Sequence, residues 1–254
     1  MALQDYYFYG QGKVFSKRLD TVGGKWRWWG DVSSLEINVA LQSVQHTESY
    51  SGNKGIARQF AISKALTVKA TLHQLDTDSL AEQVYGASSI IAAGAVVAEP
   101  LPTVLAGDTV KLEFGGASAL SIVDSAATPV VLAASNYVFD ARFGSLDINT
   151  VPAGAVQPFK ASYTRAAGKQ VNMLTQAQPI LLFRYEGINL AEGNAPVIVE
   201  IYRMATEPLQ QLALINNDTK LSQSAVNLAG LIDTSKSATG SLGQFGRIIQ
   251  LPAA

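Results

Sequence analysis

Apolar and polar side chains alternate along two long segments in the first third of the chain, Ser34–Leu41 and Phe60–Leu72. A period of two turns successive side chains to opposite faces of a β-strand, so each segment predicts a strand with one buried face. In the first segment the apolar positions are Leu35, Ile37, Val39 and Leu41. In the second, one face is predicted to carry Phe60, Ile62, Leu66, Val68, Ala70 and Leu72, with Lys64 as the one intruding charge.

The connection between these strands is long. It covers the 18 residues from Gln42 to Gln59, with Gly52 and Gly55 inside it. A simple hairpin connection takes about two to five residues. Connections much longer than this inside a compact domain are usually functional. The excess length of this one therefore requires a reason.

One helix is predicted, over Asp76–Tyr85 (DTDSLAEQVY). Asp76 or Thr77 can cap its first N–H groups, and acidic residues near its start suit the helix dipole. Gly86 follows as a stop signal. The apolar face of this segment predicts a helix that packs on a sheet.

The rest of the chain is predicted to be β-structure in two parts. The segment 87–106 is small, flexible and marked by prolines, which indicates a domain boundary. We expect a small antiparallel β unit over residues 95–165, inserted into a larger β domain formed by residues 1–94 and 166–254. The short predicted strands are Gly10–Phe15, Lys25–Trp29, Thr109–Phe114, Ala119–Val123, Val130–Ala133, Tyr137–Phe139, Ser145–Ile148 and Pro158–Tyr163. The later ones are Pro179–Ile188, Pro196–Met204, Pro208–Ile215, Leu221–Ile232 and Gln244–Leu251.

Composition excludes several classes of function. Charged residues make up only 15% of the chain and the net charge is -1, so no overall field attracts nucleic acid or an anionic membrane. Cysteine is absent, which excludes disulfides, thiolate metal ligands and thiol nucleophiles. The start of the sequence, MALQDYYFYG, lacks the pattern of a signal peptide, and no apolar run reaches the length of a membrane helix. These features predict a protein made in a cytoplasm.

Enzyme chemistry has little support in the sequence. His46 and His73 are the only histidines, and a serine nucleophile would need one of them beside it. Ser49 and Ser51 lie near His46 along the chain, but no strained turn presents either hydroxyl. Two isolated histidines do not make a zinc site. We therefore expect no catalytic residue, no metal and no cofactor, and His73 is expected to be a solvated or capping residue.

Three tryptophans in KWRWW leave two interpretations open. Trp26, Trp28 and Trp29 could stack on bases or sugars. In a strand, however, Trp29 faces away from the other two, so at least part of the set is expected to lie in the core or at a subunit contact.

The long strands also suggest an assembly. Strands that are apolar on one face and small and polar on the other can close a barrel together with copies of themselves, with the polar face toward a lumen. Closure removes the exposed edges that would otherwise aggregate. It also accounts for the low charge, because surface becomes interface.

The order of segments resembles the major tail tube protein of long-tailed bacteriophages. The resemblance is carried by YGQGKVF, WGDVSSLEINVALQSVQHTESYSG, FAISKALTVKATLHQL, TDSLAEQVYG, LLFRYEGIN, APVIVEIYRM, PLQQLALI and the final GQFGRI, with a looser match between residues 95 and 165. It implies a mainly β fold, an antiparallel β-sandwich or partial barrel with one packed α-helix, which closes into a β-barrel as a hexameric ring. It further implies a non-enzymatic virion protein whose rings stack into the conduit for genome ejection.

The same resemblance implies partners and a location. A tape measure protein would fill the lumen, tail terminator and distal tail proteins would cap the ends, and DNA would pass without sequence-specific binding. No membrane is involved, and the protein would be found in the virion tail after assembly in the host cytoplasm. The alternatives are the tube subunit of a contractile injection or secretion system and a carbohydrate-binding β-module that uses the tryptophans.

Two sets of residues follow from the resemblance. The connection is implied to contact the neighbouring ring through His46, Glu48, Ser49, Tyr50, Ser51, Gly52 and Lys54. The lumen-facing candidates are Glu36, Asn38, Thr67, Lys69 and Thr71. Lys69 is unexpected there, because basic residues retain phosphates. Either Lys69 pairs with Glu36 across the strands or the face assignment is inverted.

Overall fold

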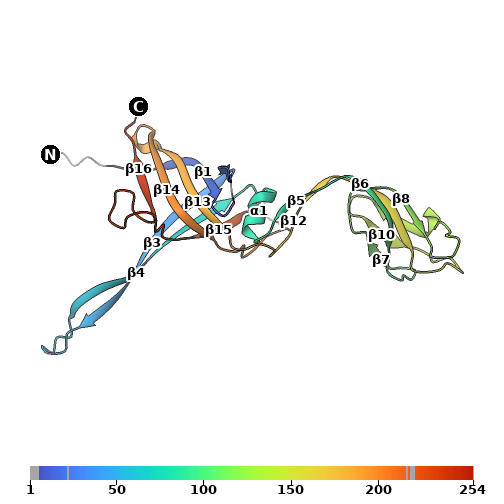
Figure 1. Ribbon diagram of the computed structural model, residues 1–254, viewed down its shortest axis with the longest axis horizontal. Helices are drawn as coiled ribbons and strands as arrows, with labels where there is room; N and C mark the ends of the chain where they lie inside the picture. The colour runs from blue at the N-terminus through green and yellow to red at the C-terminus, as the bar shows by residue number, and fades with distance from the viewer. Residues whose placement is uncertain (1–5, 22, 216, 218–220, 254) are drawn as a thin grey trace. The chain divides into compact units, whose positions relative to one another are not determined.

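The computed structural model describes residues 6–21, 23–215, 217 and 221–253. These residues form antiparallel sheets with one α-helix, which confirms the predicted mainly β class. They divide into two compact units, one of Met1–Ser88 with Val171–Ala254 and the other of Ser89–Gln170 (Figure 1). The predicted unit boundaries were 95 and 165. Among the described strands no sheet closes into a barrel within one chain.

The first unit is built on one large sheet. Its strand order is β2-β1-β13-β14-β15-β4-β3, with β16 added to β14. β15 pairs with the end of β14 at Met204–Thr206, and β16 pairs with its earlier part at Val197–Ile201. The strands are β1 (Gly10–Arg18), β2 (Arg27–Trp28), β3 (Val32–Thr47), β4 (Ile56–Leu72), β13 (Ile180–Asn189), β14 (Ala195–Thr206), β15 (Ser224–Gly230) and β16 (Gly246–Gln250).

The core of this unit lies between the two halves of the sheet, which curls so that β1, β13 and β14 face β3, β4 and β15. Trp29 is 5% exposed and packs edge-to-face on Phe183, with ring centroids 5.8 Å apart. The Trp29 Nε1–H donates to the Ser16 Oγ at 2.8 Å, so the buried indole is satisfied. The other fully or nearly fully buried members are Val14, Val68, Ala70, Leu72, Leu181, Val199, Ile201, Met204, Val226 and Leu228.

The helix α1 (Thr77–Gln83) forms where the sequence predicts one, although it is shorter than predicted. Asp76 is the N-cap, and its Oδ1 accepts the Ser79 N–H at 2.6 Å. Gln83 is buried and its Oε1 accepts a hydrogen bond from the Ser224 hydroxyl at 3.0 Å. The helix is thereby tied to β15.

The second unit has a core of its own. Phe159, Ile122 and Leu146 are fully buried in it, between the sheets β7-β10-β9 and β6-β11-β8. The chain enters and leaves through the pair β5-β12. The elements are β5 (Ser88–Ile91), β6 (Gly94–Pro100), β7 (Thr109–Lys111), β8 (Ala117–Val123), β9 (Tyr137–Asp140), β10 (Ser145–Ile148), β11 (Lys160–Arg165) and β12 (Gly168–Val171), with short 3-10 turns at Ala134–Asn136 and, in the first unit, Leu190–Glu192.

Three sequence predictions are wrong in detail. Segment 87–106 contains the boundary between the units, between Ser88 and Ser89, but much of it is strand and not flexible chain, because β5 and β6 lie in it and β6 pairs with β11. Val130–Ala133 forms only one isolated bridge, between Val131 and Val123. Among the described residues of Pro208–Ile215 no strand forms: the Leu209 N–H donates to the Gln83 carbonyl at 2.8 Å, and Leu214 and Ile215 are exposed.

No helix within the described ranges has the length and hydropathy required to span a membrane.

Because each unit has a hydrophobic core of its own, we expect the two units to unfold in separate transitions. Phe183→Ala should lower the free energy of unfolding of the first unit by about 3–5 kcal/mol, the usual cost of truncating a buried phenylalanine, because Phe183 is 0% exposed. Differential scanning calorimetry should show one of two transitions shifted. The matched variant Phe159→Ala should shift the other. If each variant shifts both transitions equally, the units do not unfold independently.

Candidate functional site

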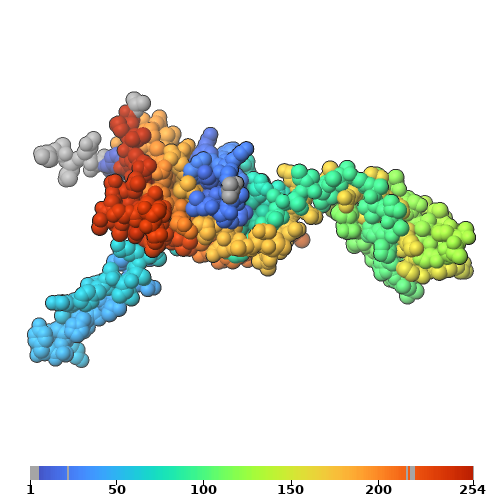
Figure 2. Space-filling model, in the orientation of Figure 1, coloured from blue at the N-terminus to red at the C-terminus, as the bar shows by residue number. Residues whose placement is uncertain are grey.

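The most exposed part of the first unit is the hairpin formed by β3 and β4. Beyond Thr67, where β15 ends its pairing with β4, the two strands pair only with each other. Figure 2 shows this hairpin extending beyond the rest of its unit. A two-stranded ribbon is at best marginally stable in water by itself. A further covering surface would therefore stabilise its outer half.

The predicted long loop is mostly strand. The pairing runs from Val32↔Leu72 to Thr47↔Ile56, with register shifts after Val32, Gln42 and His46, and it leaves Glu48–Gly55 as the turn. His46, which was assigned to the loop, lies in β3 opposite Arg58. The sequence reading stopped the strands too early because the alternation of polarity is interrupted near Gln42.

That interruption is a β-bulge. Gln42 pairs with Ser63 and the next residue, Ser43, pairs with Ala61, so Ile62 is the extra residue on β4. Before the bulge, Val39 and Leu66 lie on the same face of the hairpin, the face whose inner part packs against the core. After it, the apolar partners Val44 and Phe60 lie on the opposite face. The prediction that Phe60 shares a face with Leu66 is therefore wrong.

Both faces of the outer hairpin consequently carry exposed apolar side chains. Val39 is 79% exposed before the bulge and Phe60 is 53% exposed after it. Exposed apolar side chains gathered on one element are typical of an interaction site. The other exposed large apolar residues of the hairpin are Leu41, Val44, Ile56, Ile62 and, at the tip, Tyr50.

The tip is ordered by its own polar groups. The Glu48 N–H donates to the Gly55 carbonyl at 2.9 Å, and the Glu48 carboxylate accepts the Ser51 N–H at 3.1 Å and the Ser51 hydroxyl. The Ser51 hydroxyl, above all, lowers the pKa of Glu48 from its ordinary value. Gly52 and Lys54 take positive φ angles of 81° and 51°, which reverse the chain. Tyr50 is left 88% exposed.

This arrangement does not bring a catalytic set together. Glu48 and Ser51 are bonded to each other, and in the described residues no hydrogen bond connects His46 with Ser49 or Ser51. The backbone N–H of His73 donates to the Asp31 carbonyl at 3.0 Å, and its Nδ1 is shielded from water, so His73 is less solvated than expected. The described residues contain no cluster of three or more metal-ligating side chains.

The five lumen candidates do share one face. Glu36 is the cross-strand partner of Lys69, and Asn38 is the partner of Thr67. The Ser34 hydroxyl donates to the Thr71 Oγ1 at 2.9 Å on the same face. Asn227 of β15 pairs with Lys69 and extends the surface. The result is a small-polar face that lies opposite the buried Val68 and Ala70, with its one lysine directly across from its one glutamate.

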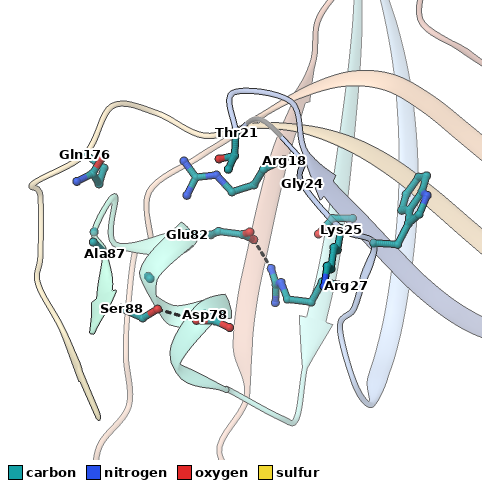
Figure 3. A pocket seen from close by; sticks show the side chains of 14 residues that line it. Arg18, Thr21, Gly24, Lys25, Arg27, Asp78, Glu82, Ala87, Ser88 and Gln176 are labelled. Atoms are coloured by element: carbon teal, nitrogen blue, oxygen red, sulfur yellow. Dashed lines mark hydrogen bonds and ion pairs between the residues drawn. The ribbon is translucent and has the colours of Figure 1, made fainter. Parts of the chain in front are cut away.

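A second candidate surface is a polar cleft at the other end of the hairpin strands (Figure 3). It has a volume of about 550 Å³ and lies between the end of β1, the segment before β2, and α1 with the residues that follow it. Its lining residues include Arg18, Lys25, Trp26, Arg27, Asp78, Glu82, Ser88 and Gln176.

Arg27 and Glu82 form the ionic centre of this cleft. One Arg27 nitrogen contacts the Glu82 Oε2 and another contacts the Ser79 Oγ. Burial raises the pKa of Glu82 above its ordinary value of 4.5, and the charge of Arg27 opposes that rise. Ser88 donates to the Asp78 Oδ1 at 2.7 Å. Lys25 is exposed and, within the described residues, has no ion-pair partner.

Sequence reasoning missed this cleft. Arg27 and Glu82 are 55 positions apart in the sequence. Taken one at a time, each residue predicts only an ordinary charged surface position. The one sequence feature that could have indicated the cleft is Trp26, which stands between the cations Lys25 and Arg27. Trp26 and Trp28 are 46% and 50% exposed while Trp29 is buried, so the expectation that part of the tryptophan set belongs to the core is confirmed. A platform of all three rings is excluded.

Removing Arg27 should expose the cost of burying Glu82. Arg27→Met should lower the free energy of unfolding at pH 7 by about 2–3 kcal/mol, because an ionised carboxylate stays buried without its cation. A carboxyl whose folded pKa is raised loses stability as pH rises through that pKa, so the deficit should shrink as pH falls toward 4.5. Urea titrations of the variant and the unmodified protein at pH 7 and pH 5 measure this loss in the free energy of unfolding. Lys25→Met, the matched control, should change little at either pH, and a deficit independent of pH would contradict this account.

Comparison with known proteins gives one family. No curated protein matches the chain. The family described as Protein of unknown function UCP028589 matches residues 7–249, which includes both units, the hairpin and the cleft. The chain therefore belongs to the family Protein of unknown function UCP028589.

Proposed function

We propose that the protein is a structural subunit of a bacteriophage tail tube, in which six copies form a ring and rings stack into a conduit for DNA. The observation that carries the proposal is the β3–β4 hairpin. Its outer half has exposed apolar side chains on both faces. Val39 and Leu41 line a groove with β14 and β16, but beyond the bulge β3 and β4 pair only with each other in the described chain. Neighbouring copies would cover these exposed side chains.

The open edges of the sheet support ring closure. The outer edge of β3 has no strand partner in the described chain, and β4 is unpaired on its other side from Ile56 to Leu66. Unprotected edges of this length favour uncontrolled association. In the proposed ring, copies arranged head to tail pair these edges and close a shared barrel, which a single chain does not form.

The small-polar face suits a lumen. Clustered basic residues would bind phosphates and retard DNA. On this face, Lys69 stands directly across from Glu36, and the remaining candidates are uncharged. Its local charge is thus balanced. The lumen would hold a tape measure protein before ejection, and terminator and distal tail proteins would cap a polymer that otherwise grows without limit.

The hairpin tip is proposed to connect one ring to the next. A rigid ribbon that ends in an exposed tyrosine suits this role, since amphipathic aromatic residues are frequent anchors in interfaces. The same geometry would serve the tube of a contractile injection system. In either case the protein is non-enzymatic, needs no cofactor, and belongs to an assembled particle.

Electron microscopy of the purified, concentrated protein tests the proposal. Six-fold rings or stacked tubes are expected, with their proportion rising with protein concentration. A chain that remains monomeric in analytical ultracentrifugation at the highest soluble concentration would refute it.

Replacing the tip tyrosine separates ring stacking from folding. Tyr50→Ala should leave the thermal transitions unchanged, because the side chain is exposed, and should weaken stacking by about 2 kcal/mol, roughly 30-fold. Tube length by negative-stain microscopy is the measurement. Phe143→Ala, which truncates an exposed aromatic ring in the other unit, is the control. Normal tubes from the Tyr50 variant would show that the tip is not the joint.

A further inference from the structure

The cleft and the hairpin tip lie at opposite ends of the same two strands. β3 starts at Val32, shortly after the cleft residues Lys25–Arg27, and β4 ends at Leu72, shortly before α1. The tip lies 15 strand positions beyond Val32, about 50 Å at 3.3 Å per residue. Figure 1 shows α1 and the hairpin tip at opposite ends of their unit.

This separation has a geometric consequence. A tip cannot reach the cleft of its own chain, because the paired strands hold it away. When copies repeat head to tail along the strand direction, however, the leading end of one copy meets the trailing end of the next. The leading end carries the tip, and the trailing end carries the cleft.

The two surfaces are also chemically matched. The tip presents one exposed ring, Tyr50, beside Glu48, whose carboxylate is held ionised by its hydrogen bonds with Ser51. The cleft presents one exposed ring, Trp26, beside Lys25, a cation with no ion pair among the described residues. Paired aromatic rings add to the energy of an interface, and complementary charge fixes its register.

The size of the cleft fits such an insertion. Its volume of about 550 Å³ is within the range of pockets that enclose a small ligand, about 300–1,000 Å³. Arg27 and Glu82 at its centre are already paired, so the floor is neutral and does not repel an entering side chain. Asp78 at the rim offers a partner for the tip residue Lys54.

We infer that the hairpin tip of one copy docks in the Lys25–Trp26–Glu82 cleft of a second copy, with Tyr50 against Trp26 and Glu48 beside Lys25. The occupant is the same chain, and the contact is heterologous, so it repeats along a filament. The inference rests on the proposed tube function and deepens it, because it names the receptor for the tip.

Cysteine cross-linking tests the contact directly, since the chain has no cysteine. The double variant Tyr50→Cys with Trp26→Cys should form disulfides between copies when assembled protein is treated with diamide. The expected product is a ladder of dimers, trimers and longer chains on a non-reducing gel. The matched control pairs Tyr50→Cys with Ala238→Cys, an exposed position outside the cleft, and should give no ladder.

Charge reversal provides a second measurement. Glu48→Lys or Lys25→Glu alone should raise the protein concentration at which tubes appear, and the double reversal should restore it. Circular dichroism checks that each variant folds. Assembled rings or tubes that give no ladder, together with independent effects of the two reversals, would overturn the docking while leaving the tube function intact. Failure of the unmodified protein to form rings would overturn both.

Discussion

The strands β3 and β4 extend beyond β15, the strand that pairs with β4. The exposed apolar surface and the open edges of the first unit follow from this difference in length. β4 pairs with β15 only from Leu72 to Thr67, after which β3 and β4 extend together for many more residues. β3 and β4 form backbone hydrogen bonds with each other, but the outward backbone groups of their outer edges and many of their apolar side chains are not covered in the described chain. A sheet in this condition favours association, because its open edges can pair with another strand and its apolar faces are unfavourable in water.

The bulge at Ile62 determines which faces of the hairpin carry exposed apolar side chains. A continuous alternation would put all apolar side chains of the hairpin on one face, and a single neighbour could cover them. The extra residue transfers Phe60 to the other face, where it is the partner of Val44. The hairpin therefore requires two covering surfaces, one near its base and one near its tip. The proposed assembly, which repeats around a ring and along its axis, would cover both faces of the hairpin.

The second unit does not depend on these contacts. It has its own core around Phe159, and the chain enters and leaves it through the paired strands β5 and β12. Its sequence predicted most of its strands, since they are short and separated by glycine and proline turns. The small residues at its start predict a flexible boundary and not the strands β5 and β6, because strands of alanine, valine and glycine lack a strong polarity pattern. Their pairing with β11 is a non-local property that no local window reports.

By itself, the sequence determined the local features: the alternation along Leu35–Leu41, a cap for α1 at Asp76 or Thr77, and the shared small-polar face of Glu36, Thr67 and Lys69. Each depends on residues close in the chain or on the strict period of a strand. Only the tertiary structure decided where the alternation changes face, and that Arg27 meets Glu82 in a cleft far from the hairpin tip. Those features depend on strand register and on the curl of the sheet, which are set by contacts between distant segments.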